Sequence, residues 1–447
     1  MKSSSIWTLT LAVFASLAAA GLASCGSASQ DAQQAQNQPL TEQEQLAIYM
    51  MQGDVGMLVQ PAMEGRETGT KGAKMAGYWL WSRMIENGLT AAGDSGFFHN
   101  FVHTPRPAVQ VHGNTGGQDE KHLGLALVQP VHGFNVLGAS EANSKSWGVI
   151  GAHYDHLGFG DESSLFRPEG DESVLQIHPG ADDNASGVAV MLELARRNKQ
   201  ERLTSENVLF AGFSGEEKGL WGSKSFCSNP TVPLEDIRWM INFDMVGRMH
   251  GDSLLVYGTG TSPVWPALVD SCNKAGLHLV IDPSGVGPSD HTSFYLEGIP
   301  VLHFFTGQHA QYHKPTDTAD LLNHEGMLAI TDYAQCLVAG LDAIEEVPYT
   351  ATADSTKDET PAFKVTLGVM PDYMYTAVGM RIDGVNPGRP AEKAGMHRGD
   401  IVVKMDTLEV VDMTSYMQGL ALFEPGQTVT VEYIRSDERM SAEVTWD

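Results

Sequence analysis

The sequence predicts an α/β protein whose main domain is a mostly parallel, twisted sheet with helices on both faces, followed by a small β-rich domain. Short apolar runs at 147–152, 208–213 and 239–243 alternate with segments of helical periodicity. Continuous apolar strands that alternate with helices are typical of parallel sheets buried on both faces. A change to Thr, Ala, Asp, Ser and Pro at 347–361 predicts a linker, which separates residues 362–447 as a second unit.

The N-terminal residues predict an exported, membrane-anchored bacterial lipoprotein on the periplasmic or cell-surface face. Residues 1–24 have the features of a signal peptide, because the apolar run at 9–23 is too short for a membrane span. The stretch Leu22-Ala23-Ser24-Cys25 resembles the lipoprotein cleavage box, in which the cysteine becomes the new N-terminus and carries lipid. Residues 25–39, rich in Ser, Gln and Ala, then predict a polar tether.

The net charge argues against a nucleic-acid-binding protein, and the cysteine content argues against a disulfide-stabilised one. Asp and Glu number 55 against 28 Lys and Arg, a net charge of −27, so we expect no binding to nucleic acid. After Cys25 the chain has three cysteines, an odd number without metal-type spacing. We therefore expect no disulfide framework and interpret them as buried apolar residues: Cys227, Cys272 and Cys336.

The predicted main domain spans residues 40–346 and begins with two helices within 42–89, separated by a break at 64–69. Strands are predicted at 97–109 and 123–137, around a glycine-rich turn. The three central strands then end in polar residues. Ligands bind outside the carboxyl ends of the strands in open α/β sheets, so these residues predict a functional site.

The residue types at these strand ends are those that bind zinc. His153 ends one strand, and Asp155 lies two residues on, where it can orient the imidazole ring through the other ring nitrogen. The loop 180–187 offers adjacent carboxylates before a helix. Zinc accepts imidazole nitrogen and carboxylate oxygen, and a zinc pair needs a carboxylate able to bridge the two ions. The sequence can supply such a set.

Six stretches, in this order across roughly residues 40–345, resemble the M28 family of zinc peptidases, which includes bacterial leucyl-type aminopeptidases. They begin with the strand end and the acidic loop just described. They are Gly151-Ala152-His153-Tyr154-Asp155-His156-Leu157-Gly158, residues 180–187, residues 214–223 with Glu216-Glu217, Asn242-Phe243-Asp244-Met245, Ser289-Asp290-His291-Thr292-Ser293-Phe294, and Tyr312-His313-Lys314-Pro315-Thr316-Asp317-Thr318.

The resemblance implies a zinc-exopeptidase-like fold, two zinc ions per chain and a role for each matched residue. Asp183 is expected to bridge the ions, with His153 and Asp244 completing one site and Glu217 and His313 the other. Glu216 is expected to be the general base, and Tyr312 to hydrogen-bond the tetrahedral oxyanion. Asp290 matches a partner of His313. Six other histidines are expected to be ordinary structural residues: His112, His132, His156, His178, His291 and His309.

Residues 362–447 resemble a PDZ domain of the bacterial protease-associated type. The stretch 385–396 and Gly399-Asp400-Ile401-Val402 carry the resemblance. It implies that a peptide C-terminus binds by strand addition at the loop formed by Leu367, Gly368, Val369 and Met370. These residues depart from the usual aromatic ending of that loop, so a structural or autoregulatory module is an equal alternative.

The sequence therefore favours a dizinc exopeptidase, most readily an aminopeptidase, that acts on peptides outside the cytoplasm. Two alternatives stay open. One is an M28 enzyme of another reaction, a carboxypeptidase or a glutaminyl cyclase. The other is a peptide-binding adaptor without catalysis, disfavoured because degenerate relatives lose the metal ligands, whereas this chain keeps all five and Glu216.

Overall fold

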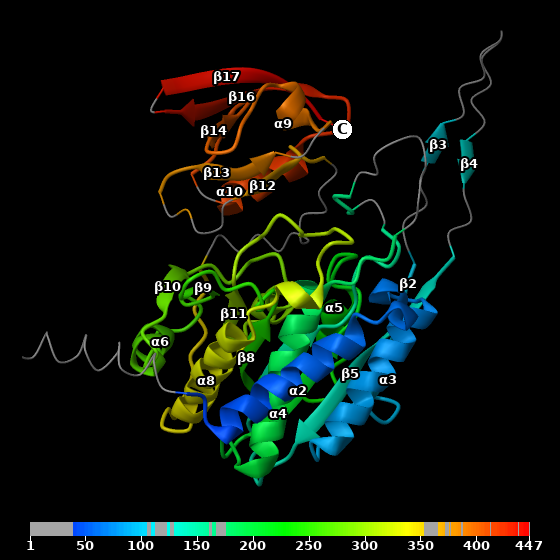
Figure 1. Cartoon of the computed structure of the whole chain (residues 1–447), viewed down its shortest axis with the longest axis vertical. Coiled ribbons are helices and arrows are strands. Elements are labelled where there is room, and N and C mark those ends of the chain that lie inside the picture. The colour runs from blue at the N-terminus through cyan, green and yellow to red at the C-terminus, as the bar shows by residue number, and fades with distance from the viewer. Residues whose placement is uncertain are drawn as a thin grey trace, which may run out of the picture.

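The computed structural model describes residues 39–104, 109–111, 123–125, 129–160, 163–166, 176–352, 365–371, 375, 377–385, 388–411, 413–436 and 438–446. A large α/β domain and a small β-rich domain follow one another along the chain (Figure 1). The expected signal peptide, Cys25 and the tether up to residue 38 lie outside the described residues. Among the described helices, none combines the length and the apolar character needed to cross a membrane.

The large domain is built on a nine-stranded sheet with the order β1-β5-β7-β6-β8-β11-β9-β10, in which β2 also pairs with β5. Strands β7, β6, β8 and β11 run parallel, which confirms the prediction for the centre of the sheet. The outer pairs β5–β7 and β9–β11 are antiparallel. The strands are β1 (Thr90–Ala91), β2 (Phe98–His103), β5 (Val131–Ser140), β6 (Trp147–His153), β7 (Asn207–Phe213), β8 (Ile237–Phe243), β9 (Ser253–Tyr257), β10 (His278–Asp282) and β11 (Val301–Phe305).

Helices cover both faces of this sheet, as predicted, because each central strand is apolar on both sides. Along β7, Val208 and Phe210 enter one buried cluster, and Leu209 and Ala211 enter another on the opposite face. The first face packs against α2 (Glu42–Leu58), α3 (Lys71–Glu86), α4 (Gly187–Gln200), α6 (Trp265–Cys272) and α8 (His324–Leu341). The second packs against α5 (Trp221–Ser228) and α7 (His291–Leu296).

The predicted break between the first two helices is present. A 3-10 segment, η1 (Pro61–Arg66), follows α2, and α3 starts only after the Thr70 cap. Glu64, Gly65 and Arg66 all have φ between 49° and 68°, the left-handed region that a right-handed helix cannot contain. The predicted strands 97–109 and 123–137 form shorter elements, with β2 and β5 in the main sheet and a separate pair, β3 (Val109–Val111) and β4 (Leu123–Leu125).

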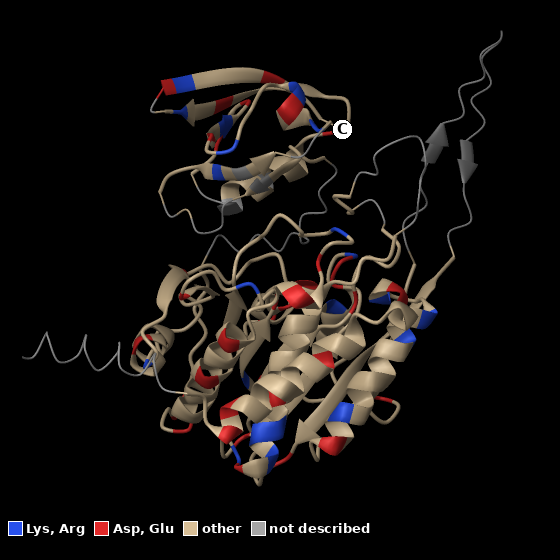
Figure 2. Ribbon diagram, viewed as in Figure 1, with Lys and Arg blue, Asp and Glu red and all other residues tan. Residues whose placement is uncertain are grey.

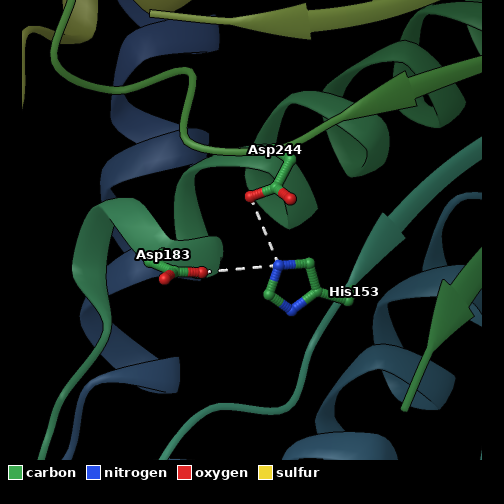
Figure 3. A group of neighbouring side chains, drawn as sticks. All are labelled: His153, Asp183 and Asp244. Atoms are coloured by element: carbon green, nitrogen blue, oxygen red, sulfur yellow. Dashed lines mark ion pairs between the residues drawn. The ribbon is translucent and has the colours of Figure 1, made fainter. Parts of the chain in front are cut away.

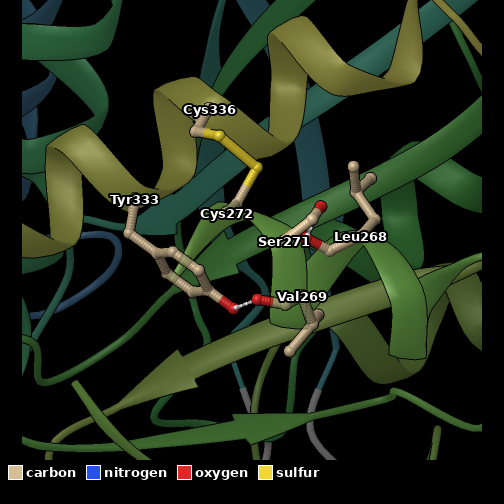
Figure 4. Close-up of a disulfide and its surroundings, with 6 residues drawn as sticks. All are labelled: Leu268, Val269, Ser271, Cys272, Tyr333 and Cys336. Carbon is tan, nitrogen blue, oxygen red and sulfur yellow. Dashed lines mark hydrogen bonds between the residues drawn. A yellow bond between two sulfur atoms is a disulfide. The ribbon is translucent and has the colours of Figure 1, made fainter. Parts of the chain in front are cut away.

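A disulfide joins α6 to α8, so the expectation that the cysteines stay unpaired is wrong for two of them. Cys272 and Cys336 are bonded across 64 residues, with a Cα–Cα distance of 5.6 Å (Figure 4). Tyr333 lies beside the bond and donates a hydrogen bond to the Val269 carbonyl at 3.0 Å. Cys227 is free and buried, as predicted. Counting cysteines could not find the pair, because only the packing of α6 on α8 brings them together.

Replacing Cys336 by serine is expected to lower the free energy of unfolding by about 2–4 kcal/mol, because a cross-link over a long loop restricts the unfolded chain. Urea unfolding monitored by circular dichroism measures the change. C227S is the control, since Cys227 is also buried but closes no loop. Equal stability of C336S and wild type under oxidising conditions would contradict the expectation.

The small domain has its own sheet and core. Its sheet has the order β12-β13-β14-β16-β17, with β15 paired to β14. Leu367 is fully buried in the core of this domain, and the edge strand β12 follows it. The elements are β12 (Val369–Pro371), β13 (Met380–Val385), α9 (Pro390–Lys393), β14 (Ile401–Met405), β15 (Leu408–Glu409), α10 (Met413–Leu422), β16 (Thr428–Arg435) and β17 (Glu438–Thr445).

Candidate metal centre

The carboxyl ends of neighbouring parallel strands bring a histidine and two aspartates together. His153 is the last residue of β6, and Asp244 follows β8, the next strand in the sheet. Asp183 comes from η2 (Ala181–Ser186), in the loop before α4. His153 Nε2 lies 3.4 Å from Asp183 Oδ1 and 3.3 Å from Asp244 Oδ1, and all three side chains point toward one another (Figure 3).

The other oxygen of Asp183 faces a second group. Asp183 Oδ2 lies 3.2 Å from His313 Nε2, which is also 3.2 Å from Glu217 Oε2. The structure therefore brings together all five predicted ligands, with Asp183 between two clusters. Figure 2 marks acidic and basic positions along the ribbon, and both kinds occur at this end of the sheet.

Asp183 is held in this central position by its own loop. The backbone N–H groups of Asp182 and Asp183 both donate to Asp317 Oδ2, at 2.9 and 3.1 Å. The Asp183–Asn184 peptide bond is cis, and the Asn184 amide donates to the Phe243 carbonyl and accepts from the Met245 N–H. The two hydrogen bonds of the Asn184 side chain hold the loop against the end of β8, directly beside Asp244.

The donor set fits a metal ion. His153 with Asp183 and Asp244, and His156 with Asp183 and Glu217, each offer three ligand atoms within 4.8 Å of one another. Within the described residues, the Nε2 atom of His153, which faces Asp183 and Asp244, is buried without a hydrogen-bond partner. Buried carboxylates in mutual repulsion and orphaned imidazole nitrogens are the groups that a divalent cation satisfies.

Glu216 stands beside the ligands as the sequence predicted, with Oε2 3.9 Å from His153 Nε2. Burial raises the pKa of its carboxyl well above the usual range, the Asp244 and Glu217 carboxylates raise it further, and His153 opposes them. Asp155 Oδ1 accepts the Glu216 N–H at 3.2 Å and lies 3.7 Å from His153 Nδ1. Asp155 therefore lies where it can position both groups.

One of the two residues predicted to lie near His313 is placed differently. The Nδ1 atom of His313 is 2.9 Å from the Ser163 carbonyl oxygen, which takes the place expected for Asp290. Asp290, the N-cap residue of α7, is instead fully buried within electrostatic range of His153, Asp155 and Asp244. Tyr312 stacks on the His313 ring, with centroids 3.8 Å apart.

His156 was missed by the sequence interpretation, which treated it as an ordinary structural residue. Its Nδ1 atom lies 2.6 Å from Glu217 Oε1. Burial lowers the pKa of this imidazole well below its usual range, so the neutral ring donates through Nδ1. This hydrogen bond leaves Glu217 Oε2 free to face His313. The sequence signal for a place at the metal centre was the position of His156, three residues after His153.

Two family models match parts of this chain. Residues 135–338 match the family model for peptidase family M28, and residues 355–445 match the PDZ domain. The chain carries an M28 peptidase domain followed by a PDZ domain. The M28 domain is 29% identical over 213 residues to leucine aminopeptidase 1 of Coccidioides posadasii, an alignment that covers 44% of this chain and 52% of that protein. The chain thus spans about half the length of the curated relative.

Solved structures confirm the fold of the M28 domain. The aminopeptidase from Aneurinibacillus sp. strain AM-1 superposes with a TM-score of 0.50 at 19% identity, covering 70% of this chain and 97% of that one. Glutaminyl cyclase from Porphyromonas gingivalis gives a TM-score of 0.50 at 17% identity, covering 66% and 98%. Because an aminopeptidase and a cyclase both match, the fold does not select the reaction.

Proposed function

We propose that this protein is a dizinc exopeptidase, an aminopeptidase that removes N-terminal residues from peptides. The observation that carries the proposal is the position of Asp183, whose two carboxylate oxygens face different histidines at 3.4 and 3.2 Å. A carboxylate shared in this way is what a pair of metal ions requires. His153 and Asp244 would hold one zinc, and Glu217 and His313 the other.

The chain's own residues suit peptide hydrolysis. Bound zinc supplies Lewis acidity, which activates water and polarises a carbonyl. Glu216 is next to the proposed ligand Glu217 but belongs to neither pair of ligands. It can take a proton from the attacking water and pass it to the leaving amine. Tyr312, stacked on His313, would hydrogen-bond the oxyanion.

The names of the relatives favour aminopeptidase activity, since leucine aminopeptidase 1 matches in sequence. A carboxypeptidase would need a cationic group to pair with the terminal carboxylate of its substrate. A cyclase of this family would bind one zinc and lack part of the ligand set. The complete set of five ligands therefore disfavours the cyclase, and metal stoichiometry separates the two reactions.

The proposal predicts that purified protein hydrolyses aminoacyl amides and loses this activity in a chelator, with recovery on addition of zinc. Metal analysis is expected to give two zinc ions per chain. A peptide with a blocked N-terminus should resist cleavage, and one with a blocked C-terminus should be cleaved. The reverse preference would establish a carboxypeptidase, and inactivity with every substrate despite bound zinc would contradict the proposal.

We further propose that the protein is exported and anchored through lipid at Cys25. The Cys272–Cys336 disulfide supports this, because such bonds persist in oxidising compartments outside the cytoplasm. Metabolic labelling with a radioactive fatty acid, in wild type and in C25A, tests the anchor.

The PDZ domain is proposed to bind a peptide C-terminus next to edge strand β12, where Gly368 has a φ of 73°.

A further inference from the structure

A segment outside the matched M28 residues lies against the metal centre. Residues 65–68, Gly-Arg-Glu-Thr, comprise the end of η1 and the start of the loop before α3. Their backbone pairs with the strand end that carries His153: Gly158 N–H donates to the Gly65 carbonyl at 2.9 Å. A Cβ atom on Gly65 would lie 2.2 Å from the Gly158 carbonyl oxygen, so only glycine allows this close approach.

Arg66 links two of the ligand-bearing segments. It is fully buried, and its guanidinium donates to the carbonyls of Tyr154, Pro179 and Gly180 at 2.8, 2.5 and 2.9 Å. Tyr154 follows the ligand His153, and Gly180 precedes the loop that carries Asp183. A further bond at 2.9 Å reaches the Leu58 carbonyl at the end of α2. One planar group thus sets the distance between the two segments.

The charge of Arg66 also faces the centre. Burial lowers the pKa of the guanidinium to about 10, and the nearby Asp183 and Asp155 carboxylates act against this effect. The residue therefore stays cationic at neutral pH. Arg66 has a φ of 56°, which is costly for a residue with a side chain. A strained backbone and a buried charge are retained where the surrounding structure requires them.

The next two residues reach the rest of the centre. Thr68 Oγ1 donates to Asp155 Oδ2 at 3.1 Å, and the other oxygen of Asp155 accepts the Glu216 N–H. Glu67 forms an ion pair at 3.1 Å with Lys218, which follows the ligand Glu217. Residues 66–68 therefore contact the segments of His153, Asp183, Glu216 and Glu217.

We propose that residues 65–68 are a positioning element of the metal centre, in which Arg66 and Thr68 fix the relative placement of the ligand-bearing segments. The inference rests on the proposed dizinc function. Neither residue belongs to the groups of side chains that could hold a metal. Both act through the groups that they hold, as outer hydrogen-bond partners of metal ligands do.

Zinc affinity of the full-length, zinc-loaded protein tests this role, through the variants R66K and T68V. Both are expected to lower zinc affinity about 10–100-fold in competition with a chelator and to lower kcat more than they change KM. T68S keeps the hydroxyl and is expected to restore most of the affinity. If R66K yields no folded protein, the comparison of T68V with T68S decides.

Two matched controls separate positioning from general loss of stability. Thr331 on α8 is fully buried and donates to the Met327 carbonyl at 2.8 Å, so T331V removes a comparable hydroxyl. Arg83 on α3 is buried and donates to Asp54 at 2.7 Å, so R83K matches R66K. Both controls should unfold more easily but keep wild-type zinc affinity. If the test and control variants had equal zinc affinity and equal kcat, the positioning role would be wrong but the proposed dizinc function would stand. If the wild-type protein bound no zinc, the proposed function would be wrong as well.

Discussion

An E216Q variant is expected to lose about 10²–10⁴-fold in kcat while it keeps its zinc, because glutamine preserves the shape of the side chain but cannot accept a proton. Glu216 stands 3.9 Å from His153 Nε2 and outside the two ligand pairs that Asp183 joins. Its role is therefore separable from metal binding. Steady-state kinetics on an aminoacyl amide, together with metal analysis of the same sample, measures both quantities.

The adjacent residue provides the contrast. Glu217 Oε2 faces His313 and Oε1 faces His156, so E217Q is expected to weaken zinc binding. E235Q, at an exposed position, is the neutral control. Were E216Q to lose zinc as readily as E217Q, Glu216 would be a ligand, and the assignment of the general base would be wrong.

The sequence was sufficient to predict the parallel centre of the sheet, because this depends on local pattern, and to single out five residues that the structure brings together. Apolar runs predict buried strands, and the ends of parallel strands meet at one edge of the sheet. His153 and Asp244 lie on neighbouring strands for this reason. The resemblance of the short motifs to a known family then singled out Asp183, Glu217 and His313 from many acidic residues and histidines.

The other features depend on contacts between distant segments, which no local pattern reports. Cys272 and Cys336 meet only because α6 packs on α8. His156 differs from an ordinary buried histidine through its contacts with Glu217, 61 residues away, and with Asp183. Asp290 interacts electrostatically with His153, whereas the Nδ1 atom of His313 contacts the Ser163 carbonyl, 150 residues earlier in the chain. Arg66 bonds carbonyls 88 to 114 residues later in the chain.

D183N is expected to reduce bound zinc from two ions per chain to one or fewer. Asparagine carries a single carbonyl oxygen, whereas Asp183 presents Oδ1 to His153 and Oδ2 to His313. Metal catalysis contributes several kcal/mol to such reactions, and each 1.4 kcal/mol is about a tenfold change in rate. We therefore expect kcat to fall by about 10³-fold or more, measured beside zinc content by mass spectrometry of the native protein.

Two further variants test whether the effect of D183N comes from the loss of the shared carboxylate. H313Q removes a ligand from one cluster only, so it should lose one zinc and retain the ion between His153 and Asp244. D182N changes the neighbouring aspartate, whose Oδ1 accepts the Gly247 N–H at 2.6 Å, and should keep both ions. If D183N retained two zinc ions, Asp183 would not be the bridge. Two ions held by D182N but not by D183N would show that the shared carboxylate, and not the acidity of the loop, assembles the pair.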